Sequence, residues 1–273
     1  MDGRNSIERG AGDAAQAAPF RPAAPSGAIM SSLKTEAWVL RRGSSKETEP
    51  GRLELDTVEL PPIGPREILA ETLYGCWEAN MTHALQREPV DVCRLRREKQ
   101  VVLGNAGVVR VLQLGSEVTT CREGDVCILV PIGTQDGIGH TIKVFGYDAP
   151  HTIGLLAKRV VLNEMQVIPL ASPTRHRYQQ WAGFPIRYAT AWENWQLSYG
   201  IWKLQYSGEE MPPTYVWGWG GGVSLAQVEL AKHYGCSGAI VASTDQRIRD
   251  LQQYGIAAVD RRDFPDLDHD EER

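Results

Sequence analysis

A glycine-rich turn between two apolar stretches constrains this chain more than any other feature of its sequence. The segment Thr214–Asp245 is predicted to fold as a buried strand, a turn, an amphipathic helix and a second strand. Four glycines in the turn supply backbone without a Cβ atom: Gly218, Gly220, Gly221 and Gly222. A pyrophosphate can approach free backbone amides at such a helix N-terminus, so the segment has the outline of a nucleotide-binding site.

The residues around the glycines define how specific this signal is. Asp245 follows the glycines by roughly 20 residues, where an acidic side chain that binds ribose hydroxyls is expected. Ser224 stands at the place of the last glycine of the fingerprint, and Trp219 adds bulk inside the turn. A purely structural turn is the alternative, because glycine serves tight turns for the same conformational freedom. The order of strand, glycines, helix and strand favours the nucleotide site.

Length and composition limit the class of protein. A chain of 273 residues is long enough for about two domains. A net charge of -5 gives no electrostatic reason to expect nucleic acid or an anionic membrane as a partner. No apolar run approaches a membrane span, so we expect a small-molecule ligand. The five cysteines are scattered without a C-x-x-C pair, which argues against disulfides and structural zinc and favours a reducing cytoplasm.

The pattern along the chain predicts an α/β protein with a β-rich part. We expect a disordered tail at 1–33, a β domain at 34–180 and a partial dinucleotide-binding domain at 181–273. The expected strands of the β domain are Ala37–Leu40, Leu53–Leu60, Glu67–Leu73, Gly107–Leu114, Asp125–Pro131, His140–Phe145 and Leu155–Leu162. A short helix is expected at Pro89–Arg97, with Arg94, Arg96 and Arg97 forming a solvated basic face.

Several spaced elements resemble one enzyme superfamily. The stretch Leu103–Cys127 (LGNAGVVRVLQLGSEVTTCREGDVC) is similar to the glycine-rich region of the medium-chain dehydrogenases/reductases. The glycine turn follows at the distance found in that superfamily, and Ala189–Trp192 resembles the T-A-Tyr element that opens its cofactor domain. The resemblance covers about 34–264 and implies a GroES-like N-terminal β domain followed by a Rossmann domain, a doubly wound parallel sheet.

The resemblance also bears on metal binding. Zinc alcohol dehydrogenases of the superfamily carry a C-G-x-D-x-H element and a G-H-E element, because Zn²⁺ prefers thiolate and imidazole ligands. Here Glu78 stands at the cysteine position of the first element, and Asn105 replaces the histidine of the second. His83 alone is more often structural than a ligand. The sequence therefore predicts no zinc.

Zinc-independent branches of the superfamily reduce C=C bonds of enoyl thioesters or quinones. Cys76–Val92 resembles the crotonyl-CoA reductase/carboxylase group, in which an asparagine and an aromatic residue lie on the pocket wall. Asn80 matches that asparagine, whereas His83 stands at the aromatic position. The resemblance implies hydride transfer from a nicotinamide, with Asn80 as donor to the substrate carbonyl and His83 and Tyr74 as further polar groups. Tyr74 could equally be a core residue, and Glu78 could cap the following helix.

The resemblance and the motif together give a set of cofactor-binding candidates. Hydroxyl groups and a guanidinium after the second strand suit a 2′-phosphate, which favours NADPH with NADH as the alternative. The candidates are Thr190, Gly218, Gly220, Gly221, Gly222, Val223, Ser243, Thr244, Asp245 and Arg247. Arg247 could instead be an exposed residue on the first turn of a helix that Gly255 ends.

Only the first half of a dinucleotide-binding domain is expected within 181–273. A complete domain has two βαβαβ halves, and an uncovered parallel sheet needs a partner for its edge and face. Six tryptophans between Trp181 and Trp219 fit either core packing or a partner surface. We therefore expect an NADPH-dependent reductase that is complete only with a second polypeptide or as a longer parent protein. The alternatives are a non-catalytic partner subunit or a truncated fragment and, least favoured, a zinc alcohol dehydrogenase. Relatives suggest a homo-oligomer.

Overall fold

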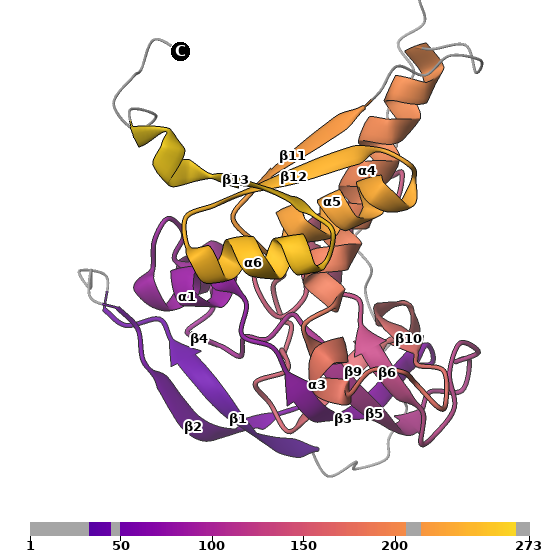
Figure 1. The fold of residues 1–273 in the computed structure, drawn as a ribbon. Coiled ribbons are helices and arrows are strands. Elements are labelled where there is room, and N and C mark those ends of the chain that lie inside the picture. Colours follow the sequence, from indigo (N-terminus) through magenta and orange to yellow (C-terminus); the bar gives the residue numbers. More distant parts are fainter. Residues whose placement is uncertain (1–32, 45–49, 206–213, 266–273) are drawn as a thin grey trace, which may run out of the picture. The chain divides into compact units, whose positions relative to one another are not determined.

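A computed structural model describes residues 33–44, 50–205 and 214–265 (Figure 1). The expected disordered tail lies, apart from Leu33, outside these residues. In the described ranges, no helix combines the length and the apolar composition needed to cross a bilayer.

The first part of the chain is antiparallel β-structure, as its alternating pattern predicts. One sheet has the order β2-β1-β4, formed by β2 (Leu53–Glu59), β1 (Lys34–Arg41) and β4 (Gln100–Val101). A second sheet has the order β10-β6-β5-β3-β9, formed by β10 (Val167–Pro169), β6 (Val126–Leu129), β5 (Gly107–Leu114), β3 (Glu67–Gly75) and β9 (Arg159–Asn163). Inward side chains of both sheets share one core, which includes Val39, Ile68, Val109 and Leu162.

Short elements connect these strands and differ in detail from the sequence expectation. They are α1 (Ala79–Gln86), α2 (Val92–Arg96), the hairpin β7 (Ile132–Gln135) and β8 (Thr141–Val144), and the 3₁₀ helix η1 (Glu164–Gln166). The helix expected at Pro89–Arg97 is shorter, because the Asp91 side chain caps it by accepting from the backbone N–H of Arg94 at 3.0 Å. The expectation of a solvated basic face was wrong for Arg96, which is buried and paired with Glu98 at 2.9 Å.

The last part of the chain is a parallel sheet with helices. Helices α3 (Tyr178–Ala182) and α4 (Pro185–Gln205) precede it. The sheet has the order β11-β12-β13, formed by β11 (Tyr215–Trp219), β12 (Ser237–Ala242) and β13 (Ala257–Asp260), with α5 (Val223–His233) and α6 (Asp245–Gln253) as the crossover helices. The 3₁₀ helix η2 (Arg261–Asp263) follows β13. This arrangement confirms the predicted half of a doubly wound sheet.

The apolar sides of the two crossover helices explain why this unit forms. Val228 of α5 and Leu251 of α6 are buried against Ile240 of the central strand β12. Strands and helices alternate along this part of the chain. Each helix carries the chain back to the edge at which the previous strand began, so the strands run parallel. The predicted domain boundary at 180/181 falls inside α3, which packs on β3 and β5.

Candidate functional site

The glycine turn combines one closely packed glycine, Gly218, with two whose Cβ positions are open, Gly220 and Gly222. A Cβ atom on Gly218 would lie 2.4 Å from Ile240 Cδ1 and 3.1 Å from Ser224 Cβ, so the absence of a side chain lets α5 approach the sheet. Gly220 and Gly222 have positive φ angles of 78° and 59°, and no atom lies within 4 Å of where their Cβ atoms would be. The turn therefore leaves space above backbone amides at the N-terminus of α5, as a pyrophosphate requires.

A small pocket of about 190 Å³ adjoins this turn. Its lining comes from the turn, the end of β12, the start of α6 and the residue after β13: Trp219, Gly220, Gly221, Val241, Ala242, Ser243, Thr244, Arg247 and Arg261. These segments meet because the carboxyl ends of parallel strands lie at one edge of the sheet. The fold thus brings together five of the predicted cofactor residues, namely Gly220, Gly221, Ser243, Thr244 and Arg247.

Two guanidinium groups give this pocket its positive charge. Arg247 lies on the first turn of α6, where its backbone N–H donates to the capping hydroxyl of Thr244 at 3.3 Å. The Arg261 guanidinium lies over the Trp219 ring, 5.6 Å from its centroid. The bulk of Trp219 is therefore a wall of the pocket and supports a cation through its aromatic face.

The other predicted cofactor residues lie outside this pocket. Asp245 forms an ion pair with Arg262 at 2.5 Å, and Arg262 also binds Asp260 at 2.6 Å. These two carboxylates raise the pKa of Arg262. Thr190 lies half-buried on α4, and Val223 is the first residue of α5.

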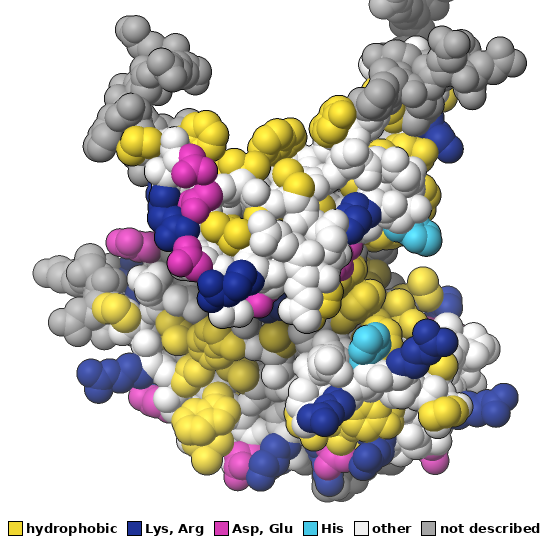
Figure 2. All heavy atoms as spheres, in the orientation of Figure 1, with side chains coloured by type: hydrophobic (Ala, Val, Ile, Leu, Met, Phe, Trp, Pro, Cys, Tyr) yellow, Lys and Arg dark blue, Asp and Glu magenta, His cyan; other side chains and the backbone are white. Residues whose placement is uncertain are grey.

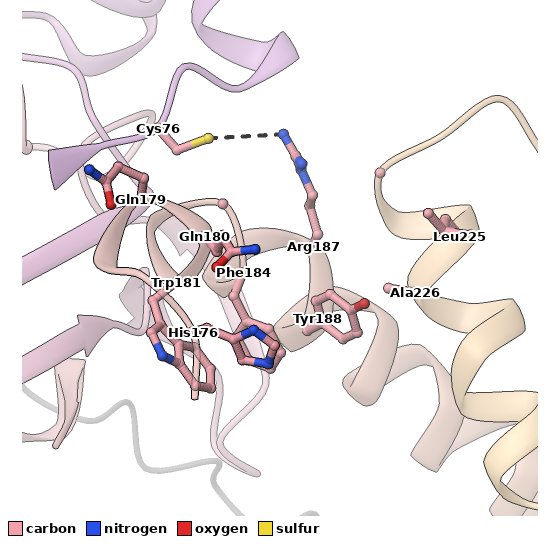
Figure 3. Close-up of a pocket in the computed structure, with 12 residues that line it drawn as sticks. Cys76, His176, Gln179, Gln180, Trp181, Phe184, Arg187, Tyr188, Leu225 and Ala226 are labelled. Carbon is pink, nitrogen blue, oxygen red and sulfur yellow. Dashed lines mark hydrogen bonds between the residues drawn. The ribbon is translucent and has the colours of Figure 1, made fainter. Parts of the chain in front are cut away.

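A second, larger pocket of about 620 Å³ includes Gly222 of the same turn in its lining. Figure 3 shows the side chains around it. Its walls come from the end of β3, helices α3 and α4, and the start of α5: Cys76, His176, Gln179, Gln180, Trp181, Gly183, Phe184, Arg187, Tyr188, Gly222, Leu225 and Ala226. The turn therefore contributes residues to two pockets, one with two arginines and one with an aromatic wall.

The polar end of the larger pocket is built around Arg187. Its Nε donates to Glu78 Oε2 at 3.2 Å, and its Nη2 lies 3.9 Å from Cys76 Sγ. Burial and the hydrogen bond with Glu78 raise the pKa of the Cys76 thiol to about 11, so the thiol is protonated at neutral pH. Glu78 is the N-cap residue of α1 but its side chain makes no capping hydrogen bond, so the capping interpretation was wrong.

The aromatic wall follows one face of α3 and the start of α4. Phe184 and Tyr188 stack with centroids 4.3 Å apart, and Trp181 packs edge-on against Phe184 at 5.3 Å. The Tyr188 hydroxyl donates to Glu229 of α5, and burial together with this hydrogen bond raises the pKa of Tyr188. These contacts fix the ring positions beside the pocket.

The three predicted catalytic residues do not line either pocket. Tyr74 is exposed near the end of β3, and His83 is exposed on α1. Asn80 is half-buried on α1, and its Oδ1 has no hydrogen-bond partner among the described residues. Their roles stay predictions.

The region that corresponds to the zinc ligands holds other chemistry. Asn105 is fully buried, and neither of its side-chain polar atoms has a partner within the part of the chain that the structure describes. Within the same part, no three His, Cys, Asp or Glu side chains gather as a metal site would need. The Glu78 carboxylate, which is paired with Arg187, and the buried Asn105 amide do not match the thiolate and imidazole ligands of a catalytic zinc.

Sequence reasoning missed Arg187 and Arg261. Arg187 lies three residues before Thr190, one helical turn away on α4, and this spacing was the available signal. Arg261 directly follows the third strand, and residues after parallel strands share one edge of the sheet. The six tryptophans divide between both interpretations: Trp195 is buried, whereas Trp192, Trp217 and Trp219 are exposed.

Comparison with known proteins identifies the fold. A 2-octenoyl-CoA carboxylase reductase in complex with NADP and 2-octenoyl-CoA matches with a TM-score of 0.67 and 19% identity over 86% of this chain and 57% of that chain. A crotonyl-CoA carboxylase/reductase in complex with NADP matches with a TM-score of 0.66 and 22% identity over 87% of this chain and 62% of that chain. An NAD-dependent alcohol dehydrogenase matches with a TM-score of 0.65 and 23% identity over 85% of this chain and 64% of that chain.

The chain has the fold of the medium-chain dehydrogenases/reductases. The resemblance seen in the sequence is thus confirmed at the level of the fold. The chain spans between 57% and 64% of the length of these three medium-chain dehydrogenase/reductase structures. No protein-family model matches the sequence, and no curated protein matches it.

Proposed function

We propose that this chain binds NADPH across the glycine turn and belongs to a zinc-independent reductase of C=C bonds in enoyl thioesters or quinone-like substrates. The observation that carries the proposal is that the glycine turn contributes residues to two pockets. Gly220 and Gly221 line the pocket with Arg247 and Arg261, and Gly222 lines the pocket with the aromatic wall. The smaller pocket, the turn and the larger pocket correspond to the three parts of NADPH, which are a phosphorylated adenosine, a pyrophosphate and a nicotinamide.

The residues of the smaller pocket fit the phosphorylated ribose. Arg247 and Arg261 supply planar guanidinium donors, and Ser243 and Thr244 supply hydroxyls. Charge-assisted hydrogen bonds of this kind favour a 2′-phosphate over a free hydroxyl. Because Asp245 is paired with Arg262, it is a weaker candidate for the ribose hydroxyls of NADH. Solved structures with this fold include NADP complexes.

The proposed reaction needs an oriented substrate and a stabilised enolate. When bound, NADPH would supply a hydride for the β-carbon of the alkene, so that the alkene electrons would move to the carbonyl oxygen before a proton adds to the α-carbon. The sequence predicts Asn80 as a donor to the carbonyl, His83 as a proton donor or orienting group and Tyr74 as a phenol donor, although none of the three lines the larger pocket. The rings of Trp181, Phe184 and Tyr188 give the larger pocket an apolar wall for the substrate.

Calorimetric titration of the whole chain with NADPH, NADH and ADP-ribose tests this proposal, together with zinc analysis of the same sample. Preferential binding of NADPH and oxidation of NADPH by crotonyl-CoA without zinc would support it. Absence of binding by any of the three nucleotides would overturn it.

A non-catalytic partner subunit is the second candidate, and the edge strand β11 favours it. Tyr215, Trp217 and Trp219 alternate along β11 and are 68%, 66% and 58% exposed. Hydrophobic side chains are visible along the side of the molecule that carries the parallel sheet (Figure 2). An edge strand with exposed aromatic groups suits a second polypeptide or a second copy of the chain. This candidate would be favoured if the chain bound the nucleotide but reduced no substrate by itself, and if addition of a partner restored turnover.

A further inference from the structure

We infer that Arg187 binds the carbonyl oxygen of the substrate at the polar end of the larger pocket, while the aromatic wall holds its acyl chain. The reaction rests on the proposed function, but the binding of an acyl thioester at Arg187 does not require NADPH. The inference adds a catalytic residue and a substrate chemistry, an uncharged carbonyl compound with a short apolar chain.

The hydrogen bonds of Arg187 leave donors for a ligand. A guanidinium has five N–H groups in a planar fork. One of them binds Glu78, and the contact with Cys76 is at the long limit for sulfur, 3.9 Å. The remaining N–H groups have no partner among the described residues, and the side chain is 39% exposed. In Figure 3 Arg187 extends from α4 toward Cys76 at the end of β3.

The charges around Arg187 favour a neutral head group. Glu78 is 8% exposed, and its carboxylate compensates the guanidinium charge. The Cys76 thiol, also at this end, is protonated. This end of the pocket therefore has no net charge to attract a carboxylate, yet it presents strong donors to a carbonyl oxygen. When negative charge develops on that oxygen, the same donors stabilise it without moving.

The rest of the pocket suits an apolar chain. Trp181, Phe184 and Tyr188 form a continuous aromatic wall, and Leu225 of α5 also lines the pocket. A volume of about 620 Å³ is within the usual range for small-molecule sites. Burial of a short acyl chain would supply affinity, while Arg187 would fix the orientation of the carbonyl group.

Protection of Cys76 from alkylation tests the inference directly. The probe is butyryl-CoA, which has the carbonyl group but no alkene that a thiol could attack. Because Cys76 and Arg187 line the same end of the pocket, we expect saturating butyryl-CoA to slow N-ethylmaleimide labelling of Cys76 about tenfold, as measured by mass spectrometry, whereas free CoA does not. The half-buried Cys236, which follows the C-terminal end of α5 and does not line the pocket, serves as the internal reference for reagent activity.

Two variants separate a binding role from a structural one. Arg187→Met removes the donors, but it leaves Glu78 buried without its partner and could unfold the chain. The double variant Glu78→Gln with Arg187→Met removes both charges, so it replaces the single variant in the experiment if the single variant does not fold. We expect either variant to lose the protection, and Arg187→Lys to keep part of it. Arg110→Met with Glu71→Gln is the matched control, because that pair is 46% and 45% exposed and lies outside the pocket.

The outcomes are distinct for the inference and for the proposed function. Protection in the unmodified chain that disappears in the Arg187 variants supports the inference, even if NADPH does not bind. No protection in the unmodified chain, or equal protection in a folded Arg187 variant, overturns it, even if NADPH binds. Where NADPH binds and crotonyl-CoA is reduced, the Arg187→Met variant should also lower kcat by about 10²-fold while the affinity for NADPH stays unchanged.

Discussion

The Nη2 atom of Arg247 lies 3.6 Å from the point that a Cβ atom on Gly221 would occupy. A guanidinium of helix α6 thus stands beside open backbone of the glycine turn. Because the turn carries no side chain there, the guanidinium and the backbone amides of the turn can contact one ligand.

Replacement of both pocket arginines should remove the preference for NADPH. Each charge-assisted hydrogen bond to a phosphate contributes about 1.5–3 kcal/mol, so Arg247→Met and Arg261→Met should each weaken NADPH binding about tenfold or more. NADH binding should change far less, because NADH lacks the 2′-phosphate. Calorimetric titration measures both affinities. Arg249→Met on the exposed side of α6 is the control, and equal losses for NADPH and NADH would contradict the assignment.

The glycines of the turn should respond differently to alanine. Gly218→Ala places a methyl group 2.4 Å from Ile240 Cδ1, so we expect a loss of about 1–3 kcal/mol of stability from overpacking. Gly220→Ala meets no atom within 4 Å, but its φ of 78° is strained for alanine and should cost about 1–2 kcal/mol. Gly137→Ala, which has open space and no positive φ, should be close to neutral. Urea unfolding compares the three variants, and a neutral Gly218→Ala would argue against the close approach of α5.

Glu164 should make the stability of the β-rich part depend on pH. Its side chain is fully buried, with Oε2 accepting the backbone N–H of Thr119 at 2.8 Å and Oε1 accepting Arg66 Nε at 2.7 Å. These bonds lower the pKa of Glu164 to about 2, whereas the pKa of a glutamate in the unfolded chain is about 4.3. The unfolded state therefore takes up the proton first, so this contribution to stability is complete above about pH 5 and is lost as the pH falls toward 2.

Glu164→Gln tests this dependence. We expect the variant to be less stable at pH 7, because a donor amide would face the N–H groups that Glu164 now accepts. The difference in unfolding free energy from the unmodified chain should shrink between pH 5 and pH 2. Glu71→Gln at an exposed position is the control. A difference that stays constant with pH would contradict the lowered pKa.

The exposed aromatic residues of β11 should control association. Trp217 is 66% exposed on the edge strand, so Trp217→Lys should leave the stability of the chain nearly unchanged. If β11 is the contact with a second copy, the substitution should shift a concentration-dependent dimer toward the monomer in light-scattering measurements. Trp192→Lys, at a 48% exposed position on α4, should not. If the unmodified chain is a monomer at all concentrations, β11 does not contact a second copy of the chain, and a different polypeptide becomes the expected partner.

The parallel unit was predictable because its signals are local. The strand after the glycines and the helix that Gly255 ends follow from periodicity within short windows, and both occur as expected. The strand before the glycines also forms, but the expectation that it is buried was wrong, because β11 lies at the edge of the sheet with exposed aromatic side chains. The strand β7 and the burial of Arg96 were not predicted. Arg96 is buried because Glu98 and the carbonyl of Thr152 bind its guanidinium, and the latter lies 56 positions along the chain.

The sequence by itself determined the fold class, the position of the glycine turn and most of the residues around the smaller pocket, because these depend on spacing along one βαβ unit. The tertiary structure alone decided that Asp245 pairs with Arg262 and that Arg261 joins Arg247. It also decided that Arg187 meets Glu78 and Cys76 across 109 and 111 positions of the chain. No local pattern encodes such pairs, since they depend on how separate elements pack, and the larger pocket exists only where those elements meet.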